Sequence, residues 1–176
     1  DSLANQTVTA TTTDNDSAGF TKSKSAVSVS ETGSTDTFTV VLTAEPASDV
    51  VISVASGDTG EATVSASSLT FTDSNWDSAQ TITVTGVNDD IIDGTISTTI
   101  TLAVVDGSSD DNFDSLANQT VTATTTDNDS AGFTVTQSSG TTAVTEAGGT
   151  DTFTVVLTAE PASDVVISVA SGDTGE

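Results

Sequence analysis

Two long stretches of the sequence occur twice without a single change, and their spacing limits what the chain can fold into. Residues 1–21 recur at 114–134, and residues 36–61 recur at 151–176. The offset is therefore 113 residues for the first stretch (from 1 to 114) and 115 residues for the second (from 36 to 151). Solenoid repeats have periods of about 20–50 residues, whereas a period of about 100–150 residues is the size of a whole domain. The repeat therefore predicts successive copies of one domain.

The register of the repeat predicts where these domains begin and end. We expect residues 1–18 to be the C-terminal strand of a preceding repeat, residues 19–131 to be one complete repeat, and residues 132–176 to be the N-terminal part of the following repeat. A short flanking piece cannot bury a core by itself. The copies differ between the two exact stretches, at residues 22–35 in one copy and 135–150 in the other.

The complete repeat has the alternating pattern of half-buried β-strands. Apolar residues alternate with Thr and Ser, as in Phe38, Val40 and Leu42, and no segment has a helical period. The connections are too short for parallel crossovers. We therefore expect an all-β fold: an immunoglobulin-like, seven-stranded antiparallel β-sandwich in tandem repeats. The expected strands are 25–30, 36–43, 49–55, 67–72, 80–86, 97–105 and 118–126.

The charge balance excludes several classes of function. The chain has 26 Asp and Glu residues against two Lys and Arg residues, a formal net charge of −24, and no His or Cys. It therefore lacks the usual general bases, thiolate nucleophiles and zinc–sulfur ligands. With Lys22 and Lys24 as its only bases, it also lacks the cationic surface that nucleic acid requires. No apolar run approaches the roughly 20 residues of a membrane span. We expect no enzyme, no nucleic-acid partner and no membrane insertion of this segment.

Two short signals for catalysis are discounted for a physical reason. Asp-Thr-Gly triplets begin at Asp58 and Asp173 and match the triplet of aspartic proteases. Each triplet is one copy of a turn within the repeat, and the flanking hydrophobic motif is absent. Paired carboxylates for glycoside hydrolysis lack the apolar pocket that would raise one pKa.

The strand order gathers distant acidic residues at one end of the predicted sandwich. If successive strands run up and down, the ends of the first, third, fifth and seventh strands meet there. The acidic residues at those ends are Glu31, Glu61, Asp89, Asp90, Asp93, Asp127 and Asp129. The opposite end also has acids, which we interpret as solvated turns: Asp73, Asp77, Asp106, Asp110, Asp111 and Asp114.

Clustered carboxylates without a nearby base repel one another unless their pKa values rise or a hard cation binds. Calcium takes six to eight oxygen ligands, and this end offers carboxylates, backbone carbonyls and water. Zinc and copper are disfavoured because nitrogen and sulfur ligands are absent. The alternative is that these acids form ordinary solvated turns, since Asp and Asn favour turns for local reasons.

Three motifs of the complete repeat resemble those of Calx-β domains. Residues 87–93 (VNDDIID) resemble the DDD-I-x-E signature, residues 126–133 (TDNDSAGF) the closing DDD-x-A-G motif, and residues 29–31 (VSE) the opening V-S-E. Glu61 stands where that family usually has an Asp. The resemblance implies an immunoglobulin-like sandwich that binds Ca²⁺ at one end through the seven acids, with the Ile91 carbonyl as a backbone ligand. Asn88 and Asn128 replace acids of the family, which should weaken calcium affinity. Glu146 and Glu176 match Glu31 and Glu61 in the following copy.

The tandem plan favours a structural function. We expect a spacer repeat of a long extracellular, cell-surface or filament protein, most similar to the extender repeats of bacterial adhesins. Calcium at the junctions would limit bending, neighbouring identical repeats would be its partners, and lateral self-association into filaments is left open. Two alternatives stay open: an adhesive module that recognises a glycan or protein through residues 22–35 or 135–150, and a calcium-responsive regulatory domain.

Overall fold

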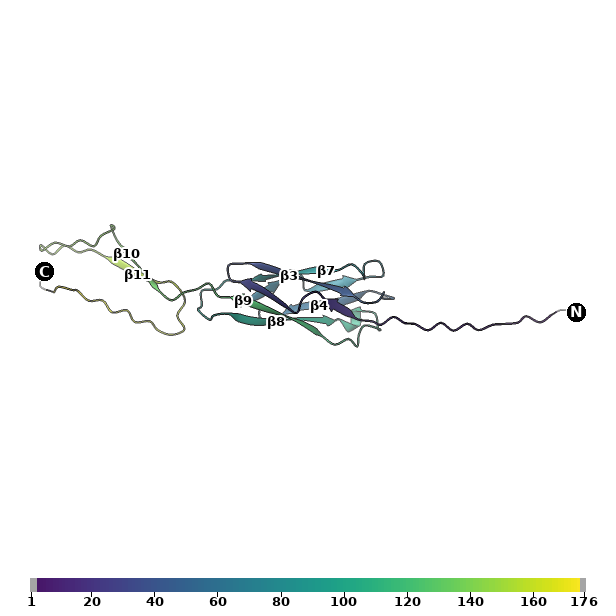
Figure 1. Cartoon of the computed structure of the whole chain (residues 1–176). Coiled ribbons are helices and arrows are strands. Elements are labelled where there is room, and N and C mark those ends of the chain that lie inside the picture. The colour runs from purple at the N-terminus through teal and green to yellow at the C-terminus, as the bar shows by residue number, and fades with distance from the viewer. Residues whose placement is uncertain (1–2, 175–176) are drawn as a thin grey trace.

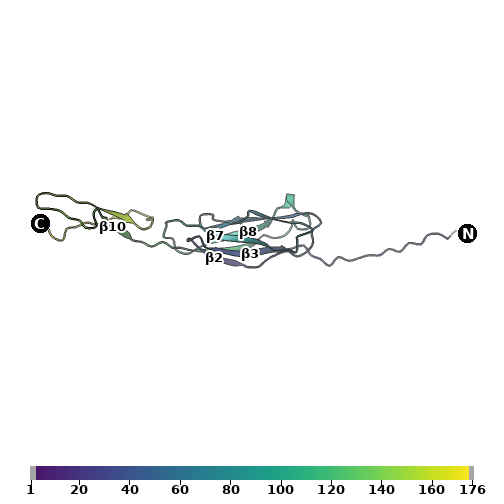
Figure 2. The same ribbon diagram turned by 90° about the horizontal axis from the view of Figure 1, so that it is seen from above.

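The computed structural model of the chain describes residues 3–174, and its centre is a two-layer β-sandwich that extends from Phe20 to Thr126 (Figure 1). One sheet has four strands in the order β1-β3-β7-β5, and the other has five in the order β2-β9-β8-β4-β6. Figure 2, turned by 90°, shows the long axis shared by the sandwich strands. The strands of the sandwich are β1 (Phe20–Lys22), β2 (Ala26–Ser30), β3 (Thr35–Leu42), β4 (Val50–Ser56), β5 (Ala62–Val64), β6 (Ser68–Phe71), β7 (Gln80–Gly86), β8 (Ile96–Val104) and β9 (Gln119–Thr126), with a 3-10 turn η1 (Asp106–Ser108) before β9.

The core lies between the two sheets and is built from the predicted alternating faces. Phe38, Val40 and Leu42 of β3 are buried, and so are Ile100 and Leu102 of β8. Their sequence neighbours are mostly Thr and Ser, which point to the outer faces because successive side chains of a strand alternate. The expected all-β, immunoglobulin-like sandwich is therefore confirmed for residues 20–126.

All seven expected strands are present, but the expectation of a seven-stranded, wholly antiparallel sandwich is wrong in two respects. Two further strands, β1 and β5, have three residues each, which is too short to give an alternating pattern. In addition, β2 pairs with β9 in parallel, from Ala26↔Thr122 to Ser30↔Thr126. The parallel pair arises because the chain leaves β1 in one sheet, joins the other sheet as β2, and runs toward the same end as β9.

The predicted strand of residues 1–18 is not observed. Residues 6–13 have the same sequence as β9, yet the described residues 3–18 form no strand and are almost entirely exposed. The difference is one of context, since β9 has β2 and β8 as hydrogen-bonding neighbours. Among the residues that the structure describes, the 6–13 segment has no such neighbours. Strand propensity alone does not fold this sequence.

The following copy repeats the pairing of β1 with β3. Strands β10 (Phe133–Gln137) and β11 (Phe153–Leu157) form a hairpin that pairs Phe133 with Leu157, the same register as Phe20 with Leu42. Phe133 is 55% exposed, whereas Phe20 is 5% exposed, so the hairpin has an open apolar face. Glu176, the match to Glu61, lies outside the described residues. Within residues 3–174, no helix has the length and apolar character needed to cross a membrane.

Gly86, at the end of β7, allows the two sheets to meet closely beside the acidic end. A Cβ atom at this position would lie 2.2 Å from the Ser30 carbonyl oxygen and 2.8 Å from the Ser30 carbonyl carbon. Because both are backbone atoms, neither can rotate away. We expect Gly86→Ala to lower the free energy of unfolding by about 1–3 kcal/mol, the usual cost of overpacking.

The matched control is Gly107→Ala, since a Cβ at Gly107 would meet no heavy atom within 4 Å. Urea unfolding of both variants measures the difference. Equal unfolding midpoints for the two variants would show that the close approach at Gly86 is not a constraint.

Candidate metal centre

Four segments bring acidic residues to one end of the sandwich. Glu31 directly follows β2, Glu61 directly precedes β5, the 88–93 loop joins β7 to β8, and the 127–129 turn follows β9. The strand registers hold these segments together, because Ser30 pairs with Thr126 and Ala62 pairs with Gly86. Six of the seven predicted acids fall into two groups of three, each with carboxylate oxygens within 4.8 Å of one another.

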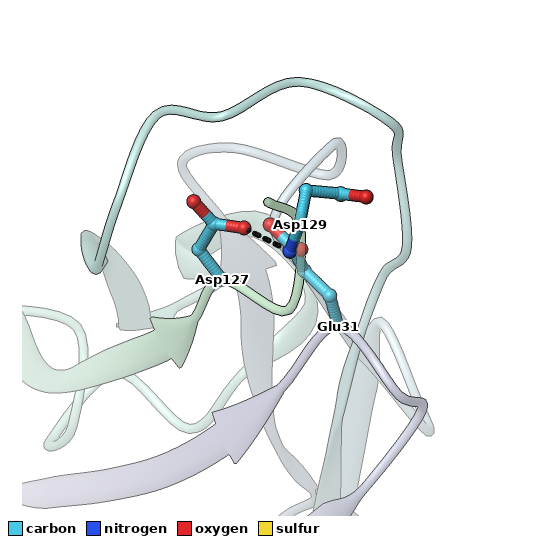
Figure 3. Close-up of side chains that lie close together, drawn as sticks. All are labelled: Glu31, Asp127 and Asp129. Atoms are coloured by element: carbon cyan, nitrogen blue, oxygen red, sulfur yellow. Dashed lines mark hydrogen bonds between the residues drawn. The ribbon is translucent and has the colours of Figure 1, made fainter. Parts of the chain in front are cut away.

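The first group consists of Glu31, Asp127 and Asp129 (Figure 3). Glu31 is only 2% exposed and accepts a hydrogen bond of 3.1 Å from the backbone N–H of Asn128. Asp127 accepts a hydrogen bond of 2.6 Å from the backbone N–H of Asp129. This short turn places both Asp side chains beside the buried Glu31, so three acids share one small volume.

The second group consists of Glu61, Asp89 and Asp93. Glu61 is 8% exposed, and its Oε2 atom is buried without a hydrogen-bond partner. Its backbone carbonyl is satisfied, by the Val87 N–H at 2.9 Å and the Thr125 hydroxyl at 3.2 Å. A buried carboxylate oxygen without a partner is costly, and a bound cation would remove that cost.

The two groups are linked through a pair of asparagines. The Asn128 side-chain amide donates a hydrogen bond of 2.9 Å to the Asn88 side-chain oxygen. These are the two positions where the sequence departs from the acids of the Calx-β motifs. Two acids at this distance would repel one another, whereas the amides join the 88–93 loop to the 127–129 turn. The pairing was missed by the sequence reasoning, which treated the two substitutions only as lost charges.

Asp90 and Ile91 lie at the rim of this end. The Asp90 carboxylate belongs to neither group of three, and the side chain is exposed. Ile91 donates its backbone N–H to the Asp89 carboxylate at 2.8 Å, and its side chain is 41% exposed. Asp90 therefore faces outward in this structure, and Ile91 shapes the turn that holds Asp89.

Burial and mutual repulsion raise the pKa of three of these carboxyl groups. The pKa of Glu61 lies above its usual range, first because of burial and then because of the charges of Asp93 and Asp89. Burial, followed by the charge of Asp127, raises the pKa of Asp129.

For Glu31 the largest influence opposes the net shift. The hydrogen bond from the Asn128 N–H lowers the pKa of this carboxyl group, but burial and the nearby acids, led by Asp127, outweigh it. The net pKa is raised. For each of the three groups with a raised pKa, the ionised form is therefore less stable in the folded protein than in the unfolded chain.

These shifts predict how stability changes with pH when calcium is chelated. A group with a raised pKa binds more protons in the folded state, so the folded state gains stability as pH falls toward the unfolded pKa, 4.5 for Glu and 3.8 for Asp. Asp36, Asp110, Asp127 and Asp151 have lowered pKa values, so the stability that they contribute is lost only as the pH falls below their ordinary value of 3.8. We expect Tm in a chelator to rise between pH 7 and about 5.

Differential scanning calorimetry over this pH range tests the prediction. Saturating calcium should remove the rise, because protons would then displace the cation instead of relieving repulsion. A Tm that falls steadily from pH 7 to 5 in the chelator would contradict the assigned shifts.

The opposite end differs from the expected solvated turns at Asp110 and, to a lesser degree, at Asp114, whose carboxyl group is partly buried and has a pKa raised first by that burial. Asp110 is only 5% exposed and accepts hydrogen bonds from the backbone N–H groups of Ala47 (2.6 Å), Ser48 (3.2 Å) and Asn112 (2.9 Å). The first of the causes that lower its pKa is the Asn112 backbone hydrogen bond. Asp110 therefore closes a loop as a structural anion, which spacing alone did not indicate.

The chemistry available at the acidic end is that of a hard cation site. Two groups of carboxylates offer only oxygen, two of these oxygen atoms (Glu61 Oε2 and Asp129 Oδ2) are buried and unpartnered, and the net charge of the chain is −24. Among the described residues, the single ion pair joins Lys24 to Asp36, which belongs to neither group. These residues fit Ca²⁺, which is bound through carboxylate and carbonyl oxygens.

Comparisons with known proteins give no family. No protein-family model matches the chain, and no curated protein matches it. Solved structures with some likeness include SSP-19, an MSP-domain protein-like family member of Caenorhabditis elegans, which is 15% identical over 60% of this chain and 98% of that chain with a TM-score of 0.42.

Two further solved structures are similarly distant. The E. coli chaperone DraB is 9% identical over 83% of this chain and 88% of that chain, with a TM-score of 0.45. The ASH/PapD-like domain 7 of human CEP192 is 10% identical over 73% of this chain and 98% of that chain, with a TM-score of 0.46. Identities this low say nothing about function.

Proposed function

We propose that this chain is part of a structural spacer in a long extracellular or cell-surface protein, built from tandem immunoglobulin-like domains that bind calcium at their junctions. One observation carries the proposal. Two clusters of three acidic residues lie at one end of the sandwich, and one of them contains a Glu61 oxygen that is buried without a hydrogen-bond partner. An acidic turn alone would leave its oxygens in water. A buried oxygen without a donor is instead the arrangement that a cation completes.

The position of this end supports a role at the junction between domains. Asp129 is followed after three residues by Phe133, where β10 of the following copy begins. Calcium held by Asp127 and Asp129 would fix the segment through which the chain leaves the sandwich. A linker this short then has little freedom to bend.

The repeat and its motifs support the tandem, calcium-binding interpretation. The exact recurrence of residues 36–61 at 151–176 suits a spacer, because recognition needs only one good site. The β10–β11 hairpin has the register of β1 and β3, as a second copy of the same domain would require. The resemblance to Calx-β motifs points to the same ligand set. The set consists of carboxylates alone, without a His, Cys or Lys among them, and we propose a function without catalysis.

An adhesive module is the second candidate, and one observation favours it. The segment that differs between copies includes β2, one of the two edge strands of the five-stranded sheet. Edge strands and their flanking turns are available to partners. A distinct ligand for each copy would support this candidate, whereas a full-length protein with many near-identical copies would favour the spacer.

The spacer function is tested on a protein with several tandem copies of residues 19–131. We expect small-angle X-ray scattering to show a long, narrow particle in calcium and a shorter, more variable one after chelation. Equal maximum dimensions in both conditions would overturn the stiffening role of calcium.

A further inference from the structure

The 88–93 loop has a second set of contacts, on the side that faces the following copy of the repeat. The Glu160 backbone N–H donates a hydrogen bond of 2.7 Å to the Asp90 carbonyl, and Ile91 and Glu160 form an isolated parallel β-bridge. Glu160 lies in the turn just after β11, next to Pro161. The acidic end is thus joined to the next copy by backbone contacts as well as by the covalent chain.

Apolar side chains lie beside this backbone bridge. Ile92 is 46% exposed and lines a hollow of about 300 Å³ together with residues of the following copy, among them Phe133, Ala159 and Pro161. Ile91, which forms the bridge, is exposed as well, at 41%. In the complete repeat the equivalents of Phe133, Leu157 and Val165 are Phe20, Leu42 and Val50, which are buried in the core, so this hollow is not a surface of a complete repeat and the docking rests on the backbone bridge.

The turn that contains Glu160 has an equivalent in the complete repeat, at the end opposite to the acidic residues. Residues 43–46 have the sequence of residues 158–161. Glu45 is exposed there, whereas Ala44 and Pro46 on either side are buried. Glu45, the residue that would form the β-bridge with a preceding copy, is therefore exposed even in a complete sandwich.

The chain that precedes the complete repeat runs past this same turn. Asp14 and Asp16, which match Asp127 and Asp129, line a hollow of about 240 Å³ with Ala44, Glu45 and other residues that include Phe113. Phe113 is buried in the complete repeat, and the core residues that stay open in the following copy are covered there. For this reason the backbone bridge, more than the apolar hollow, is the contact that both junctions can share.

We propose that the 88–93 loop of each repeat docks on the turn equivalent to residues 158–161 of the next repeat, so that one loop holds the cation on one side and the neighbouring domain on the other. The partner is the following copy of the same chain. The docking rests on the contacts above. Its strengthening by calcium rests on the proposed function, because Asp89 and Asp93 belong to the same loop.

Disulfide trapping tests the docking in the whole 176-residue chain. The described chain has no Cys, so Ile91→Cys with Glu160→Cys introduces a single pair. Partners in a β-bridge lie within the Cα separation that a disulfide spans. The matched control is Ile91→Cys with Glu146→Cys, which places the second thiol in the loop between β10 and β11 at a similar distance along the chain.

We expect the 91/160 pair to form an intramolecular disulfide at least about tenfold faster than the 91/146 pair, because docking raises the effective concentration of the two thiols. Loss of free thiols at low protein concentration measures both rates, and mass spectrometry identifies the linked peptides. Calcium should raise the rate of the 91/160 pair further and leave the control unchanged.

Each outcome bears on a separate part of the proposal. Equal rates for the two pairs would overturn the docking. A fast 91/160 pair whose rate ignores calcium would overturn the coupling while the docking stands. Calcium binding is measured separately by equilibrium dialysis, so a chain that docks without binding calcium would refute the proposed function and leave the docking intact.

Discussion

Calcium should raise the Tm of the sandwich by about 10–20 °C. At a free concentration about 100 times the dissociation constant, a ligand that binds only the folded state stabilises it by about 2.7 kcal/mol. A domain of about 100 residues gains roughly 4–8 °C in Tm for each kcal/mol. The effect is large here because the same ion would neutralise carboxylates whose pKa values are already raised, including Glu31 and Glu61.

Calorimetry in calcium and in a chelator measures this shift, with two controls. Sodium chloride at matched ionic strength separates binding from the screening of a net charge of −24. Magnesium tests selectivity, because it demands a tighter octahedral shell and gives up its water reluctantly. A rise in Tm that sodium chloride reproduces in full would remove the case for a specific site.

The second large effect concerns Glu31→Gln, whose change in Tm should have opposite signs in a chelator and in calcium. In a chelator, Glu31→Gln should raise Tm, because it removes a buried charge that neighbouring acids repel while an amide oxygen remains to accept the Asn128 hydrogen bond. In calcium, the same variant should lower Tm and weaken calcium binding by about tenfold or more, because affinity follows the number of charged ligands.

The repeat supplies the control for this variant. Glu146 occupies the position of Glu31 in the following copy, yet its side chain is exposed and belongs to neither carboxylate group. Glu146→Gln makes the same chemical change and should leave Tm and calcium affinity unaltered. If both variants shifted Tm equally and in the same direction, the effect would come from net charge, and Glu31 would have no special role.

Much of the fold follows from local patterns in the sequence. Alternation such as Val50, Ile52 and Val54 is decisive because a strand in a sandwich must bury every second side chain. Short strands have too few residues to show this alternation. The three-residue strand β5 is recognised only by its pairing with β7. The identical segments at 6–13 and 119–126 make the limit plain, because one is extended and unpaired while the other is a central strand.

The site was predictable in position but not in internal arrangement. Strand direction alone brings Glu31, Asp89 and Asp127 to one end, because each stands at the end of a strand. The separation into two groups depends on loop details, such as the hydrogen bond from the Gly94 N–H to the Asp127 carboxylate at 2.9 Å. The outward position of Asp90 depends on the same loop. Sequence patterns do not encode such contacts between residues tens of positions apart.

The most direct test of the central claim is equilibrium dialysis of the 176-residue chain against about 1 mM free calcium, a concentration that suits even weak extracellular sites. The account predicts at least one calcium ion bound per molecule, retained in excess sodium chloride, and bound about tenfold more weakly by Glu31→Gln but normally by Glu146→Gln. No bound calcium, or equal binding by both variants, would contradict it.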